Sequence, residues 1–161
     1  MARVYLSLGS NIERERYIRA GLDALRAAFG ELIVSPTYES ESVGFDGDNF
    51  YNLVVGLDTE LSVGELNGLI KAIEDVNGRV RSGPKFSSRT LDIDILTYAD
   101  CVGEVDGVAL PRDEILKNAF VLLPLSDVAG DEMHPQVRRC YADLWSEYDK
   151  RAQALWPVSL A

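Results

Sequence analysis

The chain has 161 residues, of which 47% are hydrophobic and 26% are charged. This composition is typical of a globular domain and excludes a disordered chain. A chain of this length buries about 70% of the surface that its unfolded form exposes, so it needs no disulfide to stabilise its core. Its formal net charge of -10 repels a phosphate backbone and excludes general nucleic-acid binding.

The sequence shows no sign of export or membrane insertion. The apolar run at the N-terminus is too short for a signal peptide, and no stretch of about 18 apolar residues could span a bilayer. The two cysteines, Cys101 and Cys140, lack the paired spacing of a zinc site, and His134 stands beside Pro135 in a predicted turn. We therefore expect a cytoplasmic monomer with one domain, 1–161, no membrane contact, and structural roles for these cysteines and the histidine.

The first predicted elements are a strand and a helix. Residues 4–8 form a short segment rich in β-formers that ends at Gly9. Ser10 and Glu13 have the spacing of a capping box. Apolar residues then recur with a helical period until Gly30, which predicts a helix that ends there.

Two more strands and a second helix follow. Residues 31–39 and 50–57 are predicted strands, and the Gly/Asp-rich loop 43–49 between them indicates an antiparallel pair that carries a functional loop. A second capping box starts at Ser62 and opens a helix that ends near Gly78.

The clearest strand of the chain covers residues 90–96. It completes a βαββαβ order, the split βαβ arrangement of an antiparallel sheet with helices on one face, and so predicts an α+β fold. Beyond it, residues 101–110 predict a short hairpin, and residues 120–128 and 138–148 predict a helical C-terminal extension.

Two carboxylates lie on one face of the strand 90–96. Alternation sends Asp92 and Asp94 to one side of the strand and Leu91, Ile93 and Ile95 to the other. Neighbouring like charges repel unless a cation lies between them, so the pair suits Mg²⁺. A half-buried strand with a solvent-facing side would show the same alternation, which leaves both interpretations open.

A basic segment leads into this strand. No acidic residue lies between Asp75 and Asp92. The same window holds four of the 16 basic residues of the chain: Arg79, Arg81, Lys85 and Arg89. Guanidinium groups bind phosphate oxygens in a bidentate manner, although a solvated basic loop would have the same composition. Together, the segment and the aspartate pair favour phosphate chemistry.

Three segments of the chain form recognisable motifs: Leu8-Gly9-Ser10-Asn11, Gly78-Arg79-Val80-Arg81 and Arg89-Thr90-Leu91-Asp92-Ile93-Asp94-Ile95-Leu96. With them, the chain resembles the 6-hydroxymethyl-7,8-dihydropterin pyrophosphokinases of folate biosynthesis. The resemblance covers about residues 4 to 125 and implies a ferredoxin-like α+β fold, in agreement with the βαββαβ order. It also implies an enzyme that transfers diphosphate from ATP to the pterin hydroxymethyl group and releases AMP.

The resemblance implies roles for individual residues. Asp92 and Asp94 would bind two Mg²⁺ ions, and Arg79 and Arg89 would hold the phosphates during transfer. The residues expected to contact ATP are Arg79, Arg81, Lys85, Arg89, Ile95 and Arg112. The residues expected to bind the pterin are Val43, Gly44, Phe50, Asn52, Phe86 and Phe120.

The sequence departs from the family pattern on both sides of this site. Arg112 stands where the family has a histidine, Asn118 where it has an arginine, and residues 41–44 replace a proline-rich turn beside the pterin. Arg112 would keep a positive charge at the γ-phosphate. Three alternatives remain open: a paralogue that acts on a modified pterin, a binding module without turnover, and a magnesium-dependent nucleotidyltransferase.

Overall fold

The structure is a computed structural model that describes residues 1–41, 49–78, 90–151 and 153–159. Its elements are β1 (Ala2–Ser10), α1 (Arg14–Phe29), β2 (Ile33–Val34), β3 (Thr37–Ser40), β4 (Phe50–Thr59), α2 (Val63–Val76), β5 (Asp92–Tyr98), β6 (Gly103–Val105), β7 (Val108–Leu110), α3 (Glu114–Lys117), α4 (Ala119–Ala129), α5 (Tyr141–Glu147) and β8 (Leu155–Val158). The predicted βαββαβ order is present, with the second predicted strand divided into β2 and β3.

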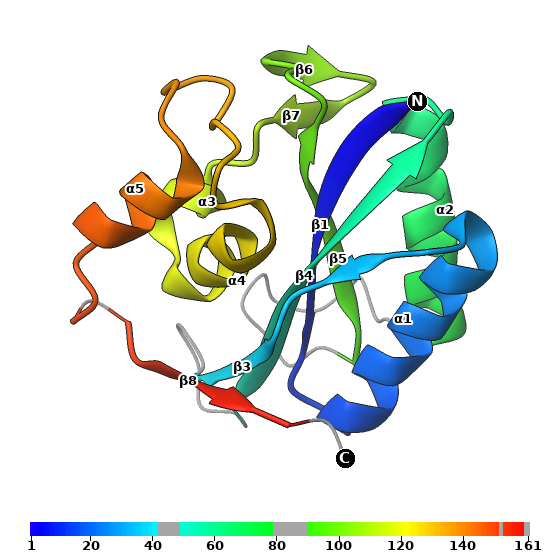
Figure 1. The fold of residues 1–161 in the computed structure, drawn as a ribbon. Coiled ribbons are helices and arrows are strands. Elements are labelled where there is room, and N and C mark those ends of the chain that lie inside the picture. The colour runs from blue at the N-terminus through cyan, green and yellow to red at the C-terminus, as the bar shows by residue number, and fades with distance from the viewer. Residues whose placement is uncertain (42–48, 79–89, 152, 160–161) are drawn as a thin grey trace.

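The main sheet is antiparallel, with the strand order β5-β1-β4-β3-β8 and β2 also paired to β4 (Figure 1). Pairing between β1 and β4 is continuous from Ala2 opposite Thr59 to Ser10 opposite Tyr51. The first and third strands of the βαββαβ unit therefore lie at the centre, which is the ferredoxin-like arrangement. The predicted fold class is confirmed.

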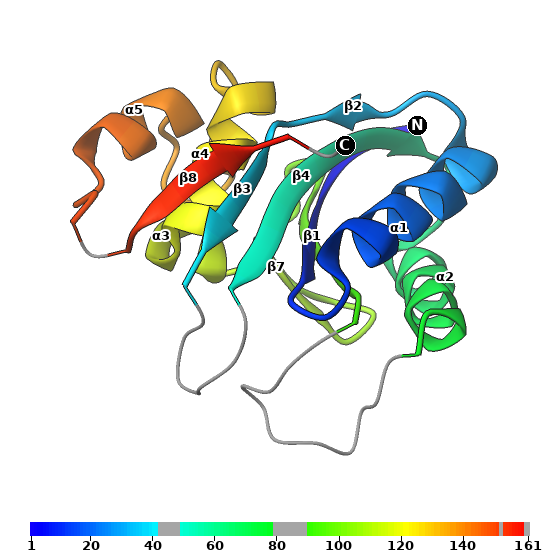
Figure 2. The ribbon, with the colours of Figure 1, turned by 90° about the horizontal axis from the view of Figure 1, so that it is seen from below.

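Helices α1 and α2 cover one face of the sheet (Figure 2). Ile18 and Leu22 of α1 and Ile70 of α2 pack with Leu6 and Leu8 of β1 in the larger of two core clusters. Burial of these side chains holds both helices on the sheet, because an amphipathic helix gains most of its stability from its apolar face.

The two predicted capping boxes have different outcomes. The second is present: the Ser62 hydroxyl accepts a hydrogen bond from the Glu65 N–H, and the Glu65 carboxylate accepts one from the Ser62 N–H. The first is wrong, because Ser10 is the last residue of β1 and its backbone pairs with β4. Helix α1 instead starts after Glu13, which has a left-handed backbone (φ 43°).

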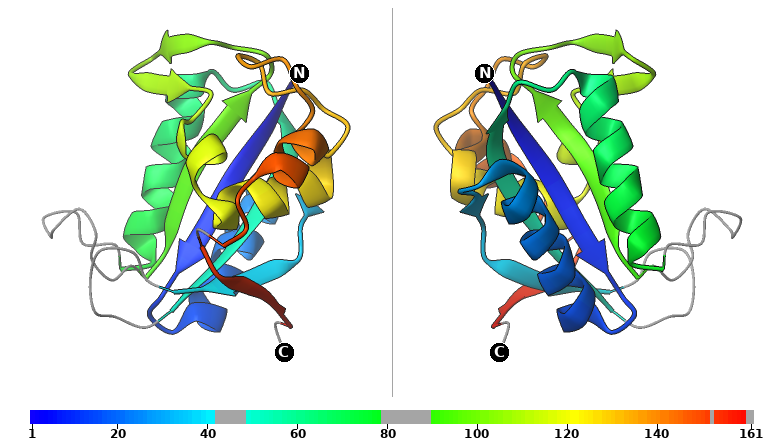
Figure 3. Two further views of the ribbon diagram at one scale, coloured as in Figure 1. Left: turned by 90° about the vertical axis from the view of Figure 1, so that its left-hand side faces the viewer. Right: turned by 90° about the vertical axis from the view of Figure 1, so that its right-hand side faces the viewer.

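The opposite face of the sheet is covered by the C-terminal extension (Figure 3). Leu122 and Leu125 of α4 pack against Tyr5 of β1 and Val54 of β4 in the second core cluster. The prediction of helices on one face therefore holds for α1 and α2, and the extension adds a layer on the other. Within the described part of the chain, no helix is long and apolar enough to cross a membrane.

The end of the chain returns to the sheet as β8, which the sequence did not predict. Thr37 of β3 lies opposite Val158, and Ser40 lies opposite Leu155. Pro157 lacks an N–H group and is tolerated here because β8 is an edge strand. The predicted hairpin is present as β6 and β7, although its first strand begins at Gly103 rather than Cys101.

The structural role predicted for His134 is confirmed. Its side chain is buried, and Nδ1 accepts hydrogen bonds from the N–H groups of Gln136 and Val137 at 3.1 and 3.2 Å. Burial lowers its pKa, which favours the neutral ring that these bonds require.

Candidate active site

Three strands place predicted site residues in one row across the sheet. Gly9 of β1 lies opposite Asn52 of β4 on one side and opposite Asp92 of β5 on the other. Residues opposite one another in antiparallel strands share a face, and this face is the one turned away from α1 and α2. Since neighbouring strands are about 4.8 Å apart, Asn52 and Asp92 stand on the order of 10 Å apart with Gly9 between them.

Gly9 has no side chain and so leaves room for the Asn52 side chain in the middle of this row. A Cβ atom at this position would lie only 2.8 Å from Asn52 Oδ1 and 3.8 Å from Phe50 Cδ1. Asn52 is itself held in place, because it is 8% exposed and its Nδ2 donates to the Ser40 hydroxyl at 3.3 Å. The row therefore holds the Asn52 amide in a fixed position over a residue that has no side chain.

Asp92 and Asp94 alternate with buried residues of β5, as predicted. Leu91 and Ile93 lie in the core, while the Asp94 side chain is 23% exposed. Burial and the charge of Asp92 raise the pKa of Asp94 well above its usual range, and the charge of Arg112 acts in the opposite direction. A divalent cation would relieve the repulsion between the carboxylates, so the pair fits Mg²⁺.

The described residues contain no group of three or more His, Cys, Asp or Glu side chains that could hold a metal ion. Two carboxylates supply only part of an octahedral shell. Mg²⁺ commonly completes its shell with water and substrate phosphates. The aspartate pair is therefore suited to a metal that arrives with a nucleotide.

Glu74 fixes the strand between the two aspartates. It is 3% exposed in α2, and its Oε2 accepts a hydrogen bond of 2.8 Å from the N–H of Ile93. Among the strands that the structure describes, β5 is at the edge of the sheet. The Glu74 carboxylate therefore pairs with a backbone N–H that points away from β1, the neighbouring strand of β5. The sequence offered one signal of this role, a glutamate on the buried stripe of an amphipathic helix.

Arg112 lies beside the aspartate pair. Its Nη2 is 3.5 Å from Asp94 Oδ1, and its Nε donates to Glu114 Oε1 at 3.1 Å. Although burial lowers the pKa of Arg112, the charges of Asp94 and Glu114 raise it overall. A permanent positive charge thus stands next to the carboxylates.

The other described site residues surround this row. Ile95 is 3% exposed within the core, so only its backbone could contact a ligand. Phe50 begins β4, and Phe120 lies in the first turn of α4, the helix that covers this face; both are partly buried. The remaining predicted residues lie outside the described part of the chain: Val43, Gly44, Arg79, Arg81, Lys85, Phe86 and Arg89.

Arg14 joins the end of β3 to the start of β4. Its Nη1 donates to Glu39 Oε2 and to the carbonyl of Asn49, both at 3.1 Å. Its guanidinium also lies 4.2 Å from the centre of the Tyr51 ring. This cluster could not be predicted from the sequence, because its members are up to 37 positions apart and have no motif spacing.

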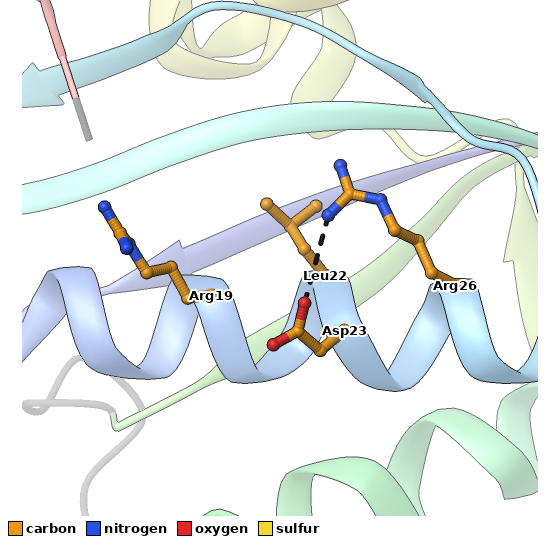
Figure 4. Close-up of a pocket in the computed structure, with 4 residues that line it drawn as sticks. All are labelled: Arg19, Leu22, Asp23 and Arg26. Atoms are coloured by element: carbon orange, nitrogen blue, oxygen red, sulfur yellow. Dashed lines mark ion pairs between the residues drawn. The ribbon is translucent and has the colours of Figure 1, made fainter. Parts of the chain in front are cut away.

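A separate hollow of about 300 Å³ lies on α1 and is lined by Arg19, Leu22, Asp23 and Arg26 (Figure 4). Arg19 pairs with Glu15 at 3.1 Å, and Arg26 pairs with Asp23 at 3.9 Å. Both positive charges are compensated within the helix, so this hollow is a weaker candidate for a phosphate site than the region around Asp94.

Fold and site together define a small ferredoxin-like α+β protein with a carboxylate pair and an arginine suited to a magnesium-bound phosphate ligand. The sequence profile described as 7,8-dihydro-6-hydroxymethylpterin-pyrophosphokinase (HPPK) matches residues 5–130. The chain belongs to this family, and the family and enzyme class indicated by the motifs are confirmed.

Curated relatives cover most of the chain. The 2-amino-4-hydroxy-6-hydroxymethyldihydropteridine pyrophosphokinase of Pseudomonas aeruginosa is 40% identical over 140 residues, which is 84% of this chain and 86% of the relative. The enzyme of the same name from Aquifex aeolicus is 36% identical over 141 residues, with coverages of 86% and 88%.

Solved structures show the same fold. The crystal structure of Plasmodium falciparum HPPK-DHPS wild type with pterin and p-hydroxybenzoate matches 93% of this chain with a TM-score of 0.73 and 16% identity. The matched region is 43% of that longer chain. At this identity the likeness supports the fold alone.

Proposed function

We propose that this protein transfers diphosphate from ATP to the hydroxymethyl group of 6-hydroxymethyl-7,8-dihydropterin and releases AMP, a step of folate biosynthesis. The observation that carries the proposal is the row formed by Asn52, Gly9 and Asp92. In this row, the Asn52 amide can hydrogen-bond to the polar edge of a ring, and the Asp92 carboxylate can bind a metal. The two groups are on the order of 10 Å apart. Membership of the family and relatives that match over most of their length give further support.

The aspartate pair and Arg112 form the nucleotide side of the proposed site. When bound, two Mg²⁺ ions would neutralise and orient the phosphate oxygens. Asp92 and Asp94 supply the protein's oxygen ligands. Arg112 holds the γ-phosphate and Ile95 offers its backbone to adenine. The family motif assigns phosphate contacts to the remaining basic residues: Arg79, Arg81, Lys85 and Arg89.

The pterin side lies across Gly9. Asn52 presents its carboxamide to the polar edge of the pterin, and Phe50 lines the same side. Phe120, carried by α4, and Phe86 stack on the two faces of the ring. Val43 and Gly44 complete this side of the site by their place in the family pattern.

The proposal is tested by measuring AMP release from ATP and Mg²⁺ with and without 6-hydroxymethyl-7,8-dihydropterin. We expect AMP only when the pterin is present. Release of diphosphate in place of AMP would identify a nucleotidyltransferase, and bound ATP without pterin-dependent AMP would leave a binding module. A higher kcat/KM with a modified pterin would identify the paralogue.

Replacement of a metal ligand gives the matching prediction at the site. Asp94→Asn removes one of two negative charges that hold the metal and should lower kcat by at least about 100-fold, on the order of 3 kcal/mol of transition-state stabilisation. Asp143→Asn, the same change on the exposed side of α5, is the control and should keep wild-type kcat. Near-normal turnover by Asp94→Asn would contradict the metal assignment.

We also propose that the protein works as a monomer in the cytoplasm. At one edge of the sheet, two backbone groups of β5 already have hydrogen-bond partners: the N–H of Ile93 donates to Glu74, and the carbonyl of Leu96 accepts from the N–H of Arg112. At the other edge, Pro157 lacks the N–H that pairing with a second copy would use. Sedimentation equilibrium should give the mass of one chain, and a stable dimer would contradict the monomer.

A further inference from the structure

Arg112 is held by two carboxylates at once, and one of them is a proposed metal ligand. Its guanidinium is 3.5 Å from Asp94 and 3.1 Å from Glu114. The three side chains are between 23% and 36% exposed. An ion pair in such a setting is partly shielded from water, so Arg112 offsets the negative charge that Asp92 and Asp94 place on one face.

The backbone keeps Arg112 in this neighbourhood. Its N–H donates to the carbonyl of Leu96, two residues beyond Asp94 in β5, at 2.8 Å. Ile115, three residues later, is fully buried in the second core cluster. The main chain is thus fixed beside the strand, and the long side chain is the part that can change partner.

A metal ion bound at the aspartate pair would compete with Arg112 for Asp94. Mg²⁺ binds carboxylate oxygens at about 2.1 Å, and a guanidinium against the same carboxylate opposes its approach by charge repulsion. Glu114 gives Arg112 a second partner that lies outside the aspartate pair. Arg112 can therefore give up Asp94 without losing every countercharge.

We propose that Arg112 is a resident counter-cation of the aspartate pair. It neutralises Asp94 while no metal is bound, gives up Asp94 when metal and nucleotide bind together, and then pairs with a nucleotide phosphate while Glu114 keeps it nearby. Metal binding thereby depends on the nucleotide, because the phosphate takes up the charge of Arg112. This inference rests on the proposed function, since it takes Asp92 and Asp94 as metal ligands.

The test measures Mn²⁺ binding to the nucleotide-free protein, from the electron paramagnetic resonance signal of free Mn²⁺ at constant ionic strength. Arg112→Ala should bind Mn²⁺ about fivefold more tightly than wild type. This change in affinity corresponds to the free energy of one partly exposed ion pair. Arg112→Lys keeps the charge and should bind as wild type does. Arg112→Ala should also bind ATP with Mg²⁺ more weakly, and these opposite shifts would not follow from misfolding.

Lys117→Ala is the matched control. Lys117 belongs to the same segment but pairs with Asp113 at 2.9 Å, so its removal should leave Mn²⁺ affinity unchanged. If Arg112→Ala does not fold, Arg112→Gln carries the same expectation with a side chain that still hydrogen-bonds.

The outcomes separate this inference from the proposed function. Equal Mn²⁺ affinity in wild type and Arg112→Ala overturns the inference, and the proposed function stands if Asp94→Asn still abolishes pterin-dependent AMP release. If Asp94→Asn changes neither Mn²⁺ binding nor AMP release, the metal assignment and this inference fall together, whereas the proposed function falls only if the wild-type protein shows no pterin-dependent AMP release. Tighter binding by Lys117→Ala as well would show a general effect of charge and would also overturn the role of Arg112.

Discussion

Gly9 lies between the two halves of the proposed site and leaves room for the Asn52 amide, so the size of this residue matters. In Gly9→Ala the new Cβ atom would meet Asn52 Oδ1 at 2.8 Å and force the amide away from Ser40. We expect the KM for the pterin to rise about tenfold, as for the loss of one well-placed hydrogen bond, with a smaller change in the KM for ATP. Steady-state kinetics with each substrate varied in turn would measure both.

Gly68→Ala is the control for this change. A Cβ atom at position 68 meets no heavy atom within 4 Å apart from its chain neighbours and the backbone of its own helix, and alanine is favoured over glycine by about 1 kcal/mol inside a helix. This variant should keep both KM values and be more stable. An unchanged KM for the pterin in Gly9→Ala would show that the Asn52 amide does not hydrogen-bond to the pterin ring.

Single residues were predictable where the pattern is local. Asp92 and Asp94 follow from two-residue alternation, and Arg112 was identified from its place in a motif. Glu74 and Arg14 depend on partners 19 or more positions away, and that proximity is created only when the sheet forms. Their contacts could not be derived from spacing.

Arg14 of α1 contacts residues of β3 and residues at the start of β4. Its loss should therefore weaken the junction of these three elements. Arg14→Ala removes an ion pair with Glu39, a bond to the carbonyl of Asn49 and a cation–π contact with Tyr51. We expect the free energy of unfolding to fall by about 1–2 kcal/mol, measured by urea denaturation.

Arg16→Ala tests whether the stability loss expected for Arg14→Ala comes from the position of Arg14 at the junction or from the removal of any positive charge on α1. Arg16 lies two residues along α1, and its pair with Glu13 joins side chains that are 68% and 58% exposed. Its removal should cost less than about 0.5 kcal/mol. If both variants lost the same free energy of unfolding, the contacts of Arg14 at the junction would add nothing to stability.

Gln153 ties the C-terminal segment to the first turn of α4. Its Oε1 accepts a hydrogen bond of 2.8 Å from the N–H of Ala119, and its Nε2 donates to Asn118 Oδ1 at 2.9 Å. The first N–H groups of a helix have no partner within the helix, so Gln153 acts as a cap supplied from 34 residues away in the sequence. This cap also sets the start of the helix that carries Phe120.

Gln153→Ala should therefore affect both stability and the pterin. We expect a loss of about 1 kcal/mol, as for a removed helix cap, and a higher KM for the pterin through displacement of Phe120. Gln136→Ala, at an exposed position, should change neither quantity. A stability loss with an unchanged KM would assign Gln153 a purely structural role.

The elements were predicted well where apolar periodicity and caps agree, as in α2. The errors have identifiable causes. The predicted strand 31–39 is divided because Pro36 has no N–H to donate, and the Ser35 hydroxyl accepts the hydrogen bond from the N–H of Val54. Strand β8 was missed because a short segment containing a proline becomes a strand only through its pairing with β3.

For the whole molecule, the order βαββαβ was enough to predict the topology of the central strands. It was not enough to predict how the second face is covered. That layer depends on contacts between distant segments: the Tyr5 hydroxyl donates to Glu132, and the Tyr38 hydroxyl donates to Asp127 at 2.5 Å. These bonds join the sheet to the C-terminal extension.

The same tyrosines predict how the stability of the whole molecule depends on pH. Burial, with the hydrogen bond to Glu132, raises the pKa of Tyr5 to about 12. Burial also raises the pKa of Tyr38 and of Tyr141. In the unfolded chain these phenols lose their protons near pH 10. Above that pH the folded state binds more protons than the unfolded state, so the free energy of unfolding decreases as the pH rises.

We therefore expect this contribution to be fully present below about pH 10 and to be lost as the pH rises through the folded-state value of about 12 for Tyr5. Urea denaturation at a series of pH values would measure it. Tyr5→Phe should lose about 1 kcal/mol at pH 8 with the bond to Glu132 and should show a smaller further loss above pH 10. If Tyr5→Phe and the wild type lost the same free energy of unfolding above pH 10, the Tyr5 phenol would not be a source of this pH dependence.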